Sequence, residues 1–259
     1  MHGVRPKKFL GQHFLKDKNI AQKIVDALSV ESKDNTIIEI GPGTGVLSEL
    51  LILRQIKELL LIEIDRESIA YLKENFIHEK VKIIEADFLK MNISDLSSSE
   101  ISIIGNFPYN ISSQIIFKTI DNRHLIPEFA GMFQKEVAER ICASPGNKQY
   151  GVISVLTQAY YNTEYLFTVN ENVFNPPPKV KSGVIRLVRK ENFKLDCDEI
   201  LFKKIVKESF NTRRKMLRVS LKRLIGKNEI LQNDFFQKRP EQLSVIDFVN
   251  ITNLISENR

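Results

Sequence analysis

Apolar runs alternate with amphipathic segments in the first half of the chain. The runs are rich in aliphatic residues without strict polar alternation, which is typical of strands buried on both faces. They span residues 36–41, 59–65, 81–87, 101–107 and 128–134. The segments between them, such as 46–55 and 66–76, have helical spacing of their apolar residues. Strands that alternate with helices predict a parallel sheet covered by helices on both sides.

The pattern changes after Tyr150. Residues 151–162 have a helical pattern, whereas 165–169 and 182–190 have strand patterns, separated by three consecutive prolines. We expect these two strands to form a hairpin at the edge of the sheet, because the prolines cannot join a helix or a central strand. From Asp196 onward the pattern predicts only helices, over residues 199–210, 213–226, 228–238 and 245–257. This organisation predicts an α/β domain over residues 1–192 and a small all-helical C-terminal domain over 193–259.

Composition restricts the location and the partners. The chain has 259 residues and two cysteines, Cys142 and Cys197, which are far apart and fit a reducing cytosol better than a disulfide framework. No apolar run approaches the roughly 18 residues of a membrane helix, and the N-terminus lacks the apolar core of a signal peptide. We therefore expect a cytoplasmic protein without a membrane partner.

Charge is distributed unevenly. Residues 179–227 contain 16 Lys and Arg against 5 Asp and Glu, a net charge of +11, whereas the whole chain carries +6. A solvated helix surface is the simpler interpretation of a run of charge. The size of the asymmetry favours a polyanion partner instead.

A glycine-rich segment follows the first predicted strand. EIGPGTGVL, residues 39–47, places Gly41, Gly43 and Gly45 before a helix, so the backbone can turn tightly and approach a ligand closely. Glu63 ends the second strand and can accept hydrogen bonds from ribose hydroxyls, and Asp87 ends the third and can accept from an adenine amino group. Together they predict an adenosine-containing cofactor at the carboxyl edge of the sheet. At this point NAD remains an alternative.

The fourth strand delivers Asn106-Phe107-Pro108-Tyr109 to the same edge. An exocyclic amine is a poor nucleophile because its lone pair is delocalised into the ring. The side-chain oxygen of Asn106 and a main-chain carbonyl fixed before proline could accept its two hydrogens and stabilise developing positive charge. Tyr109 could stack on a base flipped out of a helix. A proline-stopped strand with a capping Asn would explain only two of these residues.

Seven motifs in order make the chain resemble the ribosomal RNA adenine dimethylase family. They are GQHFL, EIGPGTG, IEID, EAD, GNFPYNIS, FNPPPKVKS and FNTRRKMLRVSLKRL. The resemblance implies a Rossmann-like class I methyltransferase fold that uses S-adenosylmethionine. We expect no metal, because no cluster of His, Cys and Asp has metal-ligand spacing. The resemblance also implies cofactor contacts for His13, Leu15, Gly41, Gly43, Glu63, Asp87 and Asn106. Phe174 would be a second aromatic residue on the target adenine.

The sequence differs from the family pattern at two positions. Phe107 stands where Leu or Ile is usual and should be tolerated, because this position contributes a carbonyl. His13 stands where Asn is also common, so we do not expect its side chain to be catalytic.

The last two motifs resemble the small-subunit enzymes more than the antibiotic-resistance methylases of large-subunit RNA. This implies dimethylation at N6 of two adjacent adenosines near the 3′ end of 16S rRNA, within the small ribosomal subunit, by a monomer. Three alternatives stay open: a large-subunit rRNA methylase, a DNA adenine methylase and a non-catalytic RNA-binding assembly factor.

The basic stretch predicts how RNA is held. If residues 213–226 form one helix, Arg214, Arg218 and Lys222 lie along one line and the leucines along the opposite line. We expect phosphate contacts from a face made by Lys179, Lys181, Arg213, Arg214, Lys215, Arg218, Lys222 and Arg223.

Overall fold

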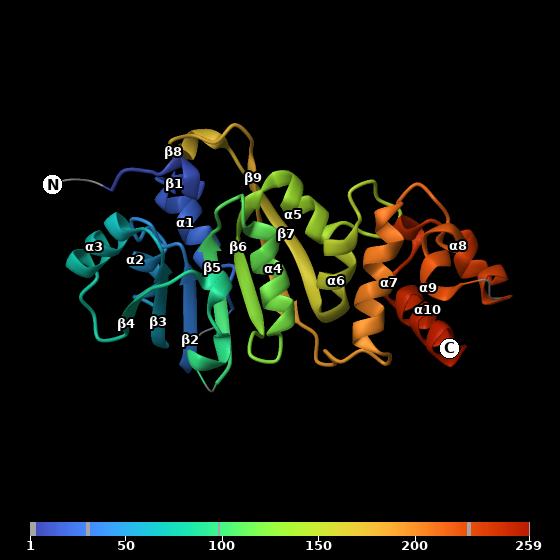
Figure 1. The fold of residues 1–259 in the computed structure, drawn as a ribbon. Helices are drawn as coiled ribbons and strands as arrows, with labels where there is room; N and C mark the ends of the chain where they lie inside the picture. The colour runs from blue at the N-terminus through green and yellow to red at the C-terminus, as the bar shows by residue number, and fades with distance from the viewer. Residues whose placement is uncertain (1–3, 30–31, 98, 227–228, 259) are drawn as a thin grey trace. The chain divides into compact units, whose positions relative to one another are not determined.

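The central feature of the fold is a seven-stranded sheet (Figure 1). The structure is a computed structural model that describes residues 4–29, 32–97, 99–226 and 229–258. The strand order is β4-β3-β2-β5-β6-β9-β7; β2 to β6 run parallel and β9 runs antiparallel to β6. The bounds are β2 (Ser32–Ile40), β3 (Ile56–Glu63), β4 (Val81–Glu85), β5 (Ile101–Asn106), β6 (Glu128–Gln134), β7 (Tyr161–Val169) and β9 (Ser182–Arg189). The predicted α/β class with a parallel sheet is confirmed, and the two late strands are neighbours at one end of the sheet.

Helices connect the strands. Asp17 and Asp65 cap the first turns of α1 and α3 by accepting backbone N–H groups, as expected of Asp at a helix start. The predicted helix at 46–55 is a single turn, because the chain from Gly43 to Leu47 forms turns instead. The helices of this part are α1 (Lys18–Val25), α2 (Ser48–Leu51), α3 (Arg66–Asn75), α4 (Ser112–Asp121), α5 (Lys135–Cys142) and α6 (Val152–Tyr160), with short 3-10 turns η2 (Phe88–Lys90) and η3 (Ile93–Asp95).

The order of the strands reverses between β2 and β5. The chain moves outward from β2 through β3 to β4, and then returns to the other side of β2 as β5. Glu39 pairs with Ile104, so Gly41 and Asn106 leave the two strands at the same level. Open α/β sheets bind ligands at such a switch point, outside the carboxyl ends of the strands.

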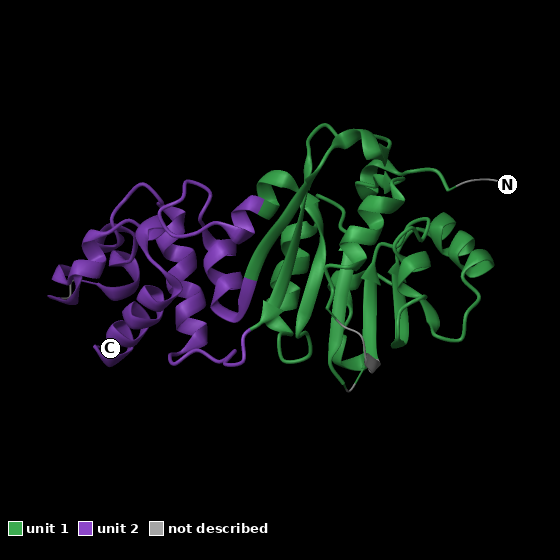
Figure 2. Cartoon of the chain, turned by 180° about the vertical axis from the view of Figure 1, so that it is seen from behind, with its two compact units in different colours: residues 1–138, 163–189 green, residues 139–162, 190–259 purple. Residues whose placement is uncertain are grey.

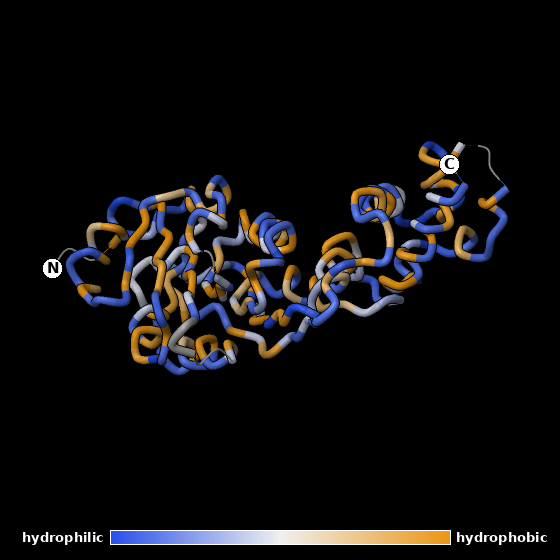
Figure 3. Tube along the Cα trace, turned by 90° about the horizontal axis from the view of Figure 1, so that it is seen from below, coloured by the Kyte–Doolittle hydropathy of each residue, from blue (hydrophilic) through white to orange (hydrophobic). Residues whose placement is uncertain are grey.

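The core lies on both faces of the sheet. Ile37 and Ile38 are neighbours on β2 and point to opposite faces, yet both are fully buried. Figure 3 shows the hydrophobic positions gathered along the central strands and alternating with hydrophilic ones in the helices. Burial on both faces explains why these strands have continuous aliphatic runs.

A second, two-stranded sheet lies outside the main one. β1 (Phe14–Leu15) pairs antiparallel with β8 (Phe174–Asn175). β1 follows the 3-10 turn η1 (Lys8–Leu10), and β8 follows η4 (Glu171–Val173). The N-terminal segment, residues 4–16, is therefore joined to the loop between β7 and β9.

The chain forms two compact units (Figure 2). Unit 1 comprises residues 1–138 and 163–189, and unit 2 comprises 139–162 and 190–259. The return to unit 2 at Lys190 lies close to the boundary predicted at 192/193. The stretch 139–162 differs from that prediction, because α6 packs against α7 (Glu199–Asn211) and α10 (Val245–Glu257) of unit 2.

Unit 2 is helical, but two of its predicted helices are wrong. Residues 213–226 form two short helices, α8 (Leu217–Ser220) and α9 (Lys222–Ile225), and Met216 is extended. The Leu217 N–H donates to the Lys238 carbonyl, which fixes the start of α8 there. Residues 228–238, of which Asn228 lies outside the described residues, contain the 3-10 turns η5 (Glu229–Gln232) and η6 (Asp234–Gln237), and Asn233 caps η6; η7 (Pro240–Gln242) follows.

Candidate active site

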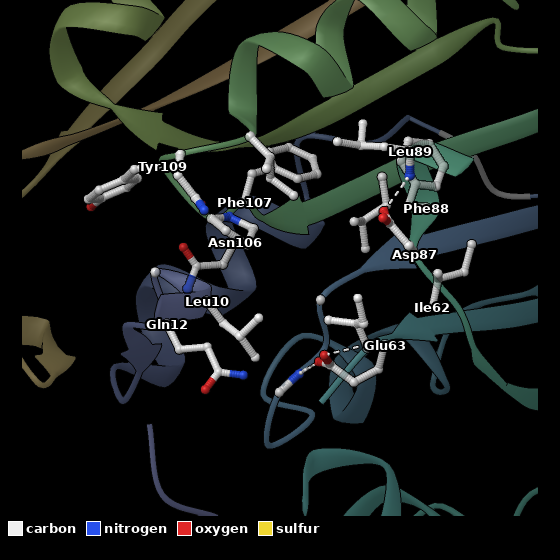
Figure 4. Close-up of a pocket in the computed structure, with 18 of the residues that line it drawn as sticks. Leu10, Gln12, Ile62, Glu63, Asp87, Phe88, Leu89, Asn106, Phe107 and Tyr109 are labelled. Atoms are coloured by element: carbon white, nitrogen blue, oxygen red, sulfur yellow. Dashed lines mark hydrogen bonds between the residues drawn. The ribbon is translucent and has the colours of Figure 1, made fainter. Parts of the chain in front are cut away.

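A cavity of about 200 Å³ opens at the carboxyl edge of the sheet, where the strand order reverses (Figure 4). Its walls come from the loops after β2, β3, β4 and β5 and from the N-terminal segment. The predicted site residues that line it are His13, Gly41, Gly43, Glu63, Asp87, Asn106, Phe107, Pro108 and Tyr109. Motifs that are far apart in the sequence therefore meet in one cavity.

The glycine-rich loop is shaped by close packing. Gly41, Gly43 and Gly45 have positive φ angles of 68°, 57° and 79°. A Cβ atom on Gly43 would lie 2.8 Å from the ring of Phe14, and one on Gly45 would lie 2.1 Å from the ring of Phe76. Both the backbone conformation and the space exclude a side chain. The loop can therefore bring its backbone to a ligand in the cavity.

Glu63 holds the loop after β2 against the end of β3. Its Oε2 accepts from Gly43 N at 3.1 Å, and its Oε1 accepts from Ile64 N and Asp65 N at 2.8 and 2.9 Å. Burial raises the pKa of Glu63, although these three N–H donors favour the charged form. A carboxylate oxygen can accept about two hydrogen bonds, so Oε2 keeps capacity for a ligand hydroxyl.

Asp87 follows β4, the strand beside β3, and lies two residues beyond the partner of Glu63 in this pair. Its Oδ1 accepts from Leu89 N at 3.0 Å and caps η2. Lys118 Nζ donates to the carbonyls of Leu89 and Met91 and lies 5.3 Å from the ring centre of Phe88. Lys118 therefore fixes the backbone of this part of the cavity wall. The second carboxylate oxygen of Asp87, Oδ2, lies 3.7 Å from the exposed ammonium group of Lys90.

The orientation of the Asn106 amide follows from one hydrogen bond. Nδ2 donates to the His13 carbonyl at 2.9 Å, and a carbonyl can only accept. The amide nitrogen is thereby assigned to the N-terminal segment, so Oδ1 is the end that remains for a ligand donor. This is the acceptor role that the sequence predicts for Asn106.

Phe107 anchors the motif in the core. Its ring lies 5.0 Å from those of Phe129 and Phe133 and covers two glycines of the neighbouring strands. A Cβ atom on Gly131 would lie 2.2 Å from this ring, and one on Gly105 would lie 2.7 Å from it. Phe is accommodated here because β5 and β6 both leave space beneath it. The carbonyl before Pro108 is thus held by a buried side chain.

Tyr109 stands at the outer side of the cavity. Its ring is stacked with the imidazole of His13 at a centroid distance of 5.7 Å, and its hydroxyl shares a hydrogen bond of 2.6 Å with Ser182. His13 Nδ1 lies 2.7 Å from the Pro176 carbonyl. Tyr109 is therefore held by His13, which directly precedes β1, and by Ser182, which begins β9.

Comparisons with known proteins identify the family. The model of the family described as ribosomal RNA adenine dimethylase matches residues 3–257. The chain belongs to this family. A ribosomal RNA small subunit methyltransferase A from Bacteroides fragilis is 55% identical over 98% of this chain and 93% of its own length. The protein of the same name from Flavobacterium johnsoniae is also 55% identical, over 98% and 97%.

Solved structures agree with the fold of the ribosomal RNA adenine dimethylase family. A dimethyladenosine transferase from Plasmodium falciparum has a TM-score of 0.84 and 26% identity, over 95% of this chain and 98% of its own. The 23S rRNA methyltransferase ErmE has a TM-score of 0.72 and 22% identity, over 93% and 99%. The Rossmann-like class I methyltransferase fold predicted from the sequence is confirmed.

The N-terminal segment covers the dimethylase cavity through contacts that the sequence analysis missed. Lys7 Nζ pairs with the Asp65 carboxylate, and Gln12 donates to the same carboxylate at 3.4 Å. Burial acts to raise the pKa of Asp65, but the bonds from Lys7, Ser68 and Gln12 outweigh it, and the pKa is lowered. The signal available in the sequence was the position of Asp65, directly after IEI and before a helix.

Two predicted residues do not line the cavity. Leu15 pairs with Phe174 in the β1–β8 sheet and borders a smaller cavity of about 30 Å³ beside Glu39 and Asn106. Phe174 is 1% exposed, so its ring packs in the core of unit 1 and offers no face to a base in this structure. Phe174 would have to move to stack on a base, and its stacking role stays a prediction.

The predicted basic residues lie in both units. Lys179 and Lys181 are exposed in unit 1, and unit 2 exposes the predicted residues Arg214, Lys215, Arg218, Lys222 and Arg223. Leu217 and Leu221 are buried, as expected of the opposing apolar side. Arg213 differs, because it is half-buried, donates to the Asn147 carbonyl and lies 4.0 Å from Glu241.

Candidate metal clusters and membrane-spanning helices are both absent from the described part of the chain. No group of three or more His, Cys, Asp and Glu is placed to hold a metal ion there. Within the same residues, no helix is both long and apolar enough to cross a bilayer.

Glu39 is a buried acid that the sequence analysis did not single out. Its side chain lies beneath the glycine-rich loop, where Ser48 Oγ donates to Oε2 at 2.6 Å. Burial raises the pKa of Glu39 to about 8; the Ser48 bond opposes this shift and the charge of Glu63 adds to it. Folded dimethylase therefore carries a proton on Glu39 near neutral pH.

We expect Glu39→Gln to flatten the dependence of stability on pH. Between the ordinary pKa of 4.5 and about 8, the folded state keeps a proton that the unfolded state releases, so stability falls as pH rises. Gln keeps the size and an acceptor for Ser48 but has no proton to lose. Between pH 5 and 8 the free energy of unfolding of the variant should rise relative to that of the wild type by up to a few kcal/mol. Denaturant unfolding at several pH values measures this, with the exposed Glu74→Gln as control. Parallel curves for Glu39→Gln and wild type would contradict the assignment.

Proposed function

We propose that this chain is an S-adenosylmethionine-dependent methyltransferase that dimethylates N6 of two adjacent adenosines in the 3′-terminal hairpin loop of 16S rRNA. The observation that carries the proposal is the meeting of the glycine-rich loop, Glu63, Asp87 and a correctly oriented Asn106 in one cavity. The names of the relatives at 55% identity support the small subunit as the source of the RNA. On this proposal the protein is cytoplasmic, acts as a monomer and contributes to subunit assembly.

The residues of the cavity fit S-adenosylmethionine. Gly41 and Gly43 line the cavity and have positive φ, so the backbone of the loop after β2 can approach a ligand there, while the ring of Phe14 packs against Gly43. Glu63 would accept from a ribose hydroxyl through Oε2, the oxygen that keeps acceptor capacity, and Asp87 would accept from the adenine amino group. When bound, this cofactor supplies an electrophilic methyl group.

The chain's own residues would then activate the target amine. Asn106 Oδ1 and the Phe107 carbonyl would accept the two N6 hydrogens, which draws the nitrogen lone pair out of the ring and stabilises the developing positive charge. Both acceptors are preorganised, one by the His13 carbonyl and the other by the buried Phe107 ring. Tyr109 would stack on the flipped base. A strong general base is not required, because the methylated amine is acidic.

The basic residues would hold the RNA. Phosphate contacts give affinity without reading the base, so the exposed arginines and lysines of unit 2 would position a folded RNA, while the cavity in unit 1 selects adenine. Arg213 contributes less directly, because its guanidinium is engaged within unit 2.

The proposed function is tested by methyl transfer from labelled S-adenosylmethionine. Undermethylated small subunits should accept close to four methyl groups each, on two adjacent adenosines. Large subunits and duplex DNA serve as comparison substrates and should accept none. Transfer to large subunits alone, or to no substrate, would contradict the proposal.

Asn106→Ala should separate binding from chemistry. Removal of one preorganised polar group at the reacting atom typically costs roughly two to three orders of magnitude in kcat. Affinity for S-adenosylmethionine should fall by no more than a few-fold, because Glu63 and Asp87 are unchanged and the N-terminal segment is still held by Lys7 and by β1. Calorimetry and single-turnover methyl transfer measure the two effects. A wild-type rate in this variant would rule out the mechanism.

Substitution of Arg214, Arg218 and Lys222 by Ala should weaken binding to small subunits. Each lost phosphate contact reduces the slope of log K against log salt by about 0.7–0.9. All three side chains are exposed, so folding and cofactor affinity should be retained. A binding titration at several salt concentrations measures the slope.

The matched control for this variant replaces three exposed lysines of unit 1, Lys23, Lys57 and Lys73. It changes the net charge by the same amount and should leave the slope nearly unchanged. If the two triple variants have equal slopes, only total charge matters, and the basic face of unit 2 is a solvated surface.

A further inference from the structure

The hydroxyl of Tyr109 has no role in stacking. A flat ring is enough to stack on a base, and Phe would provide it. In the structure this hydroxyl lies 2.6 Å from Ser182 Oγ, and the two share a hydrogen bond. Ser182 closes the motif FNPPPKVKS, to which the proposed mechanism gives no role beyond two basic side chains.

Ser182 is held rigidly. It is 0% exposed and is the first residue of β9, where it pairs with Gln134 at the end of β6. Beside it, Lys135 N donates to the Lys181 carbonyl at 2.9 Å. A Cβ atom on the next residue, Gly183, would lie 2.8 Å from both Ala138 and Tyr165. The serine hydroxyl is thus fixed to the main sheet and does not move with a loop.

Tyr109 is attached more loosely. It follows the last residue of β5 by three positions, it is only half-buried, and its ring can turn about two side-chain torsions. His13 covers one face of the ring, but this contact is a stacked pair that allows sliding. The hydrogen bond at the far end of the ring adds the second fixed point that sets the plane.

We propose that Ser182 is a positioning residue for the target base, which acts by holding the Tyr109 hydroxyl so that the ring is fixed before adenine enters. The inference rests on the proposed function and assigns a task to the last residue of the proline-rich motif. It also explains why the fourth residue of NFPY is Tyr when Phe would stack equally well. Ser182 does not touch the reacting atoms.

A purely structural role predicts something different. Truncation of Ser182 or Tyr109 would then lower the temperature of unfolding, and the rate of methyl transfer by folded enzyme would be unchanged. Under the positioning role, loss of either hydroxyl lets the ring reorient, so kcat falls even where the enzyme is fully folded. Because each hydroxyl acts only through the other, loss of both should be no worse than loss of one.

The experiment compares Ser182→Ala, Tyr109→Phe and the double variant at a temperature where all are folded. Single-turnover methyl transfer to undermethylated small subunits gives the rate, and calorimetry gives the affinity for S-adenosylmethionine. We expect each single variant to lose about tenfold in rate, the typical effect of one hydrogen bond, and the double variant to lose about tenfold as well. Cofactor affinity should be unchanged in all three.

Ser209→Ala is the matched control. Ser209 is also 0% exposed, and its hydroxyl donates to the Ile205 carbonyl within α7 of unit 2. It should lose stability and keep the wild-type rate. The inference is overturned if Ser182→Ala keeps the wild-type rate, as the control does, or if the double variant loses about a hundredfold. Failure of the wild type itself to transfer methyl groups would instead refute the proposed function.

Discussion

The hydrogen bond from Asn106 to the His13 carbonyl connects the two sides of the site. It ties the end of β5 to the N-terminal segment, which packs on the glycine-rich loop through Phe14. Because the partner is a carbonyl, the bond also decides which end of the amide faces the ligand. A methylatable amine needs an acceptor at that position, and the amide could not supply one if it were turned round. Cofactor cover and target acceptor are thus set by the same contact.

Below this contact the sheet provides a stiff base. Phe107 fills the space above Gly105 and Gly131, so the chain direction at Pro108 is determined by packing in the core. A close-packed interior does not deform gradually. Asn106 Oδ1 and the Phe107 carbonyl therefore keep their separation when the surface around them moves. Most of the residues that would bind RNA are exposed side chains of unit 2, where such rigidity is not needed.

Much of this could be predicted from the sequence. Strands buried on both faces produce continuous aliphatic runs, so β2 to β6 were located to within a few residues, and the polar residues at their carboxyl ends had to meet in a parallel sheet. The helix over 213–226 failed because the start of α8 is fixed by a long-range bond to Lys238, which no local period records. The burial of Phe174 and the partners of Lys7 and Ser182 were not predicted for the same reason: each depends on a residue more than fifty positions away.

The N-terminal segment is attached on both sides of the cavity. On one side Lys7 and Gln12 bind Asp65 at the start of α3, and on the other β1 pairs with β8. Four methyl groups on one substrate mean that spent cofactor must leave and fresh cofactor must enter several times. A cover fastened at both edges opens only when one row of contacts breaks, and the β1–β8 row includes the loop next to Tyr109. Release of the cover on the β1–β8 side would also free His13, whose imidazole stacks on Tyr109, so cofactor exchange and the surroundings of the target base share one set of contacts.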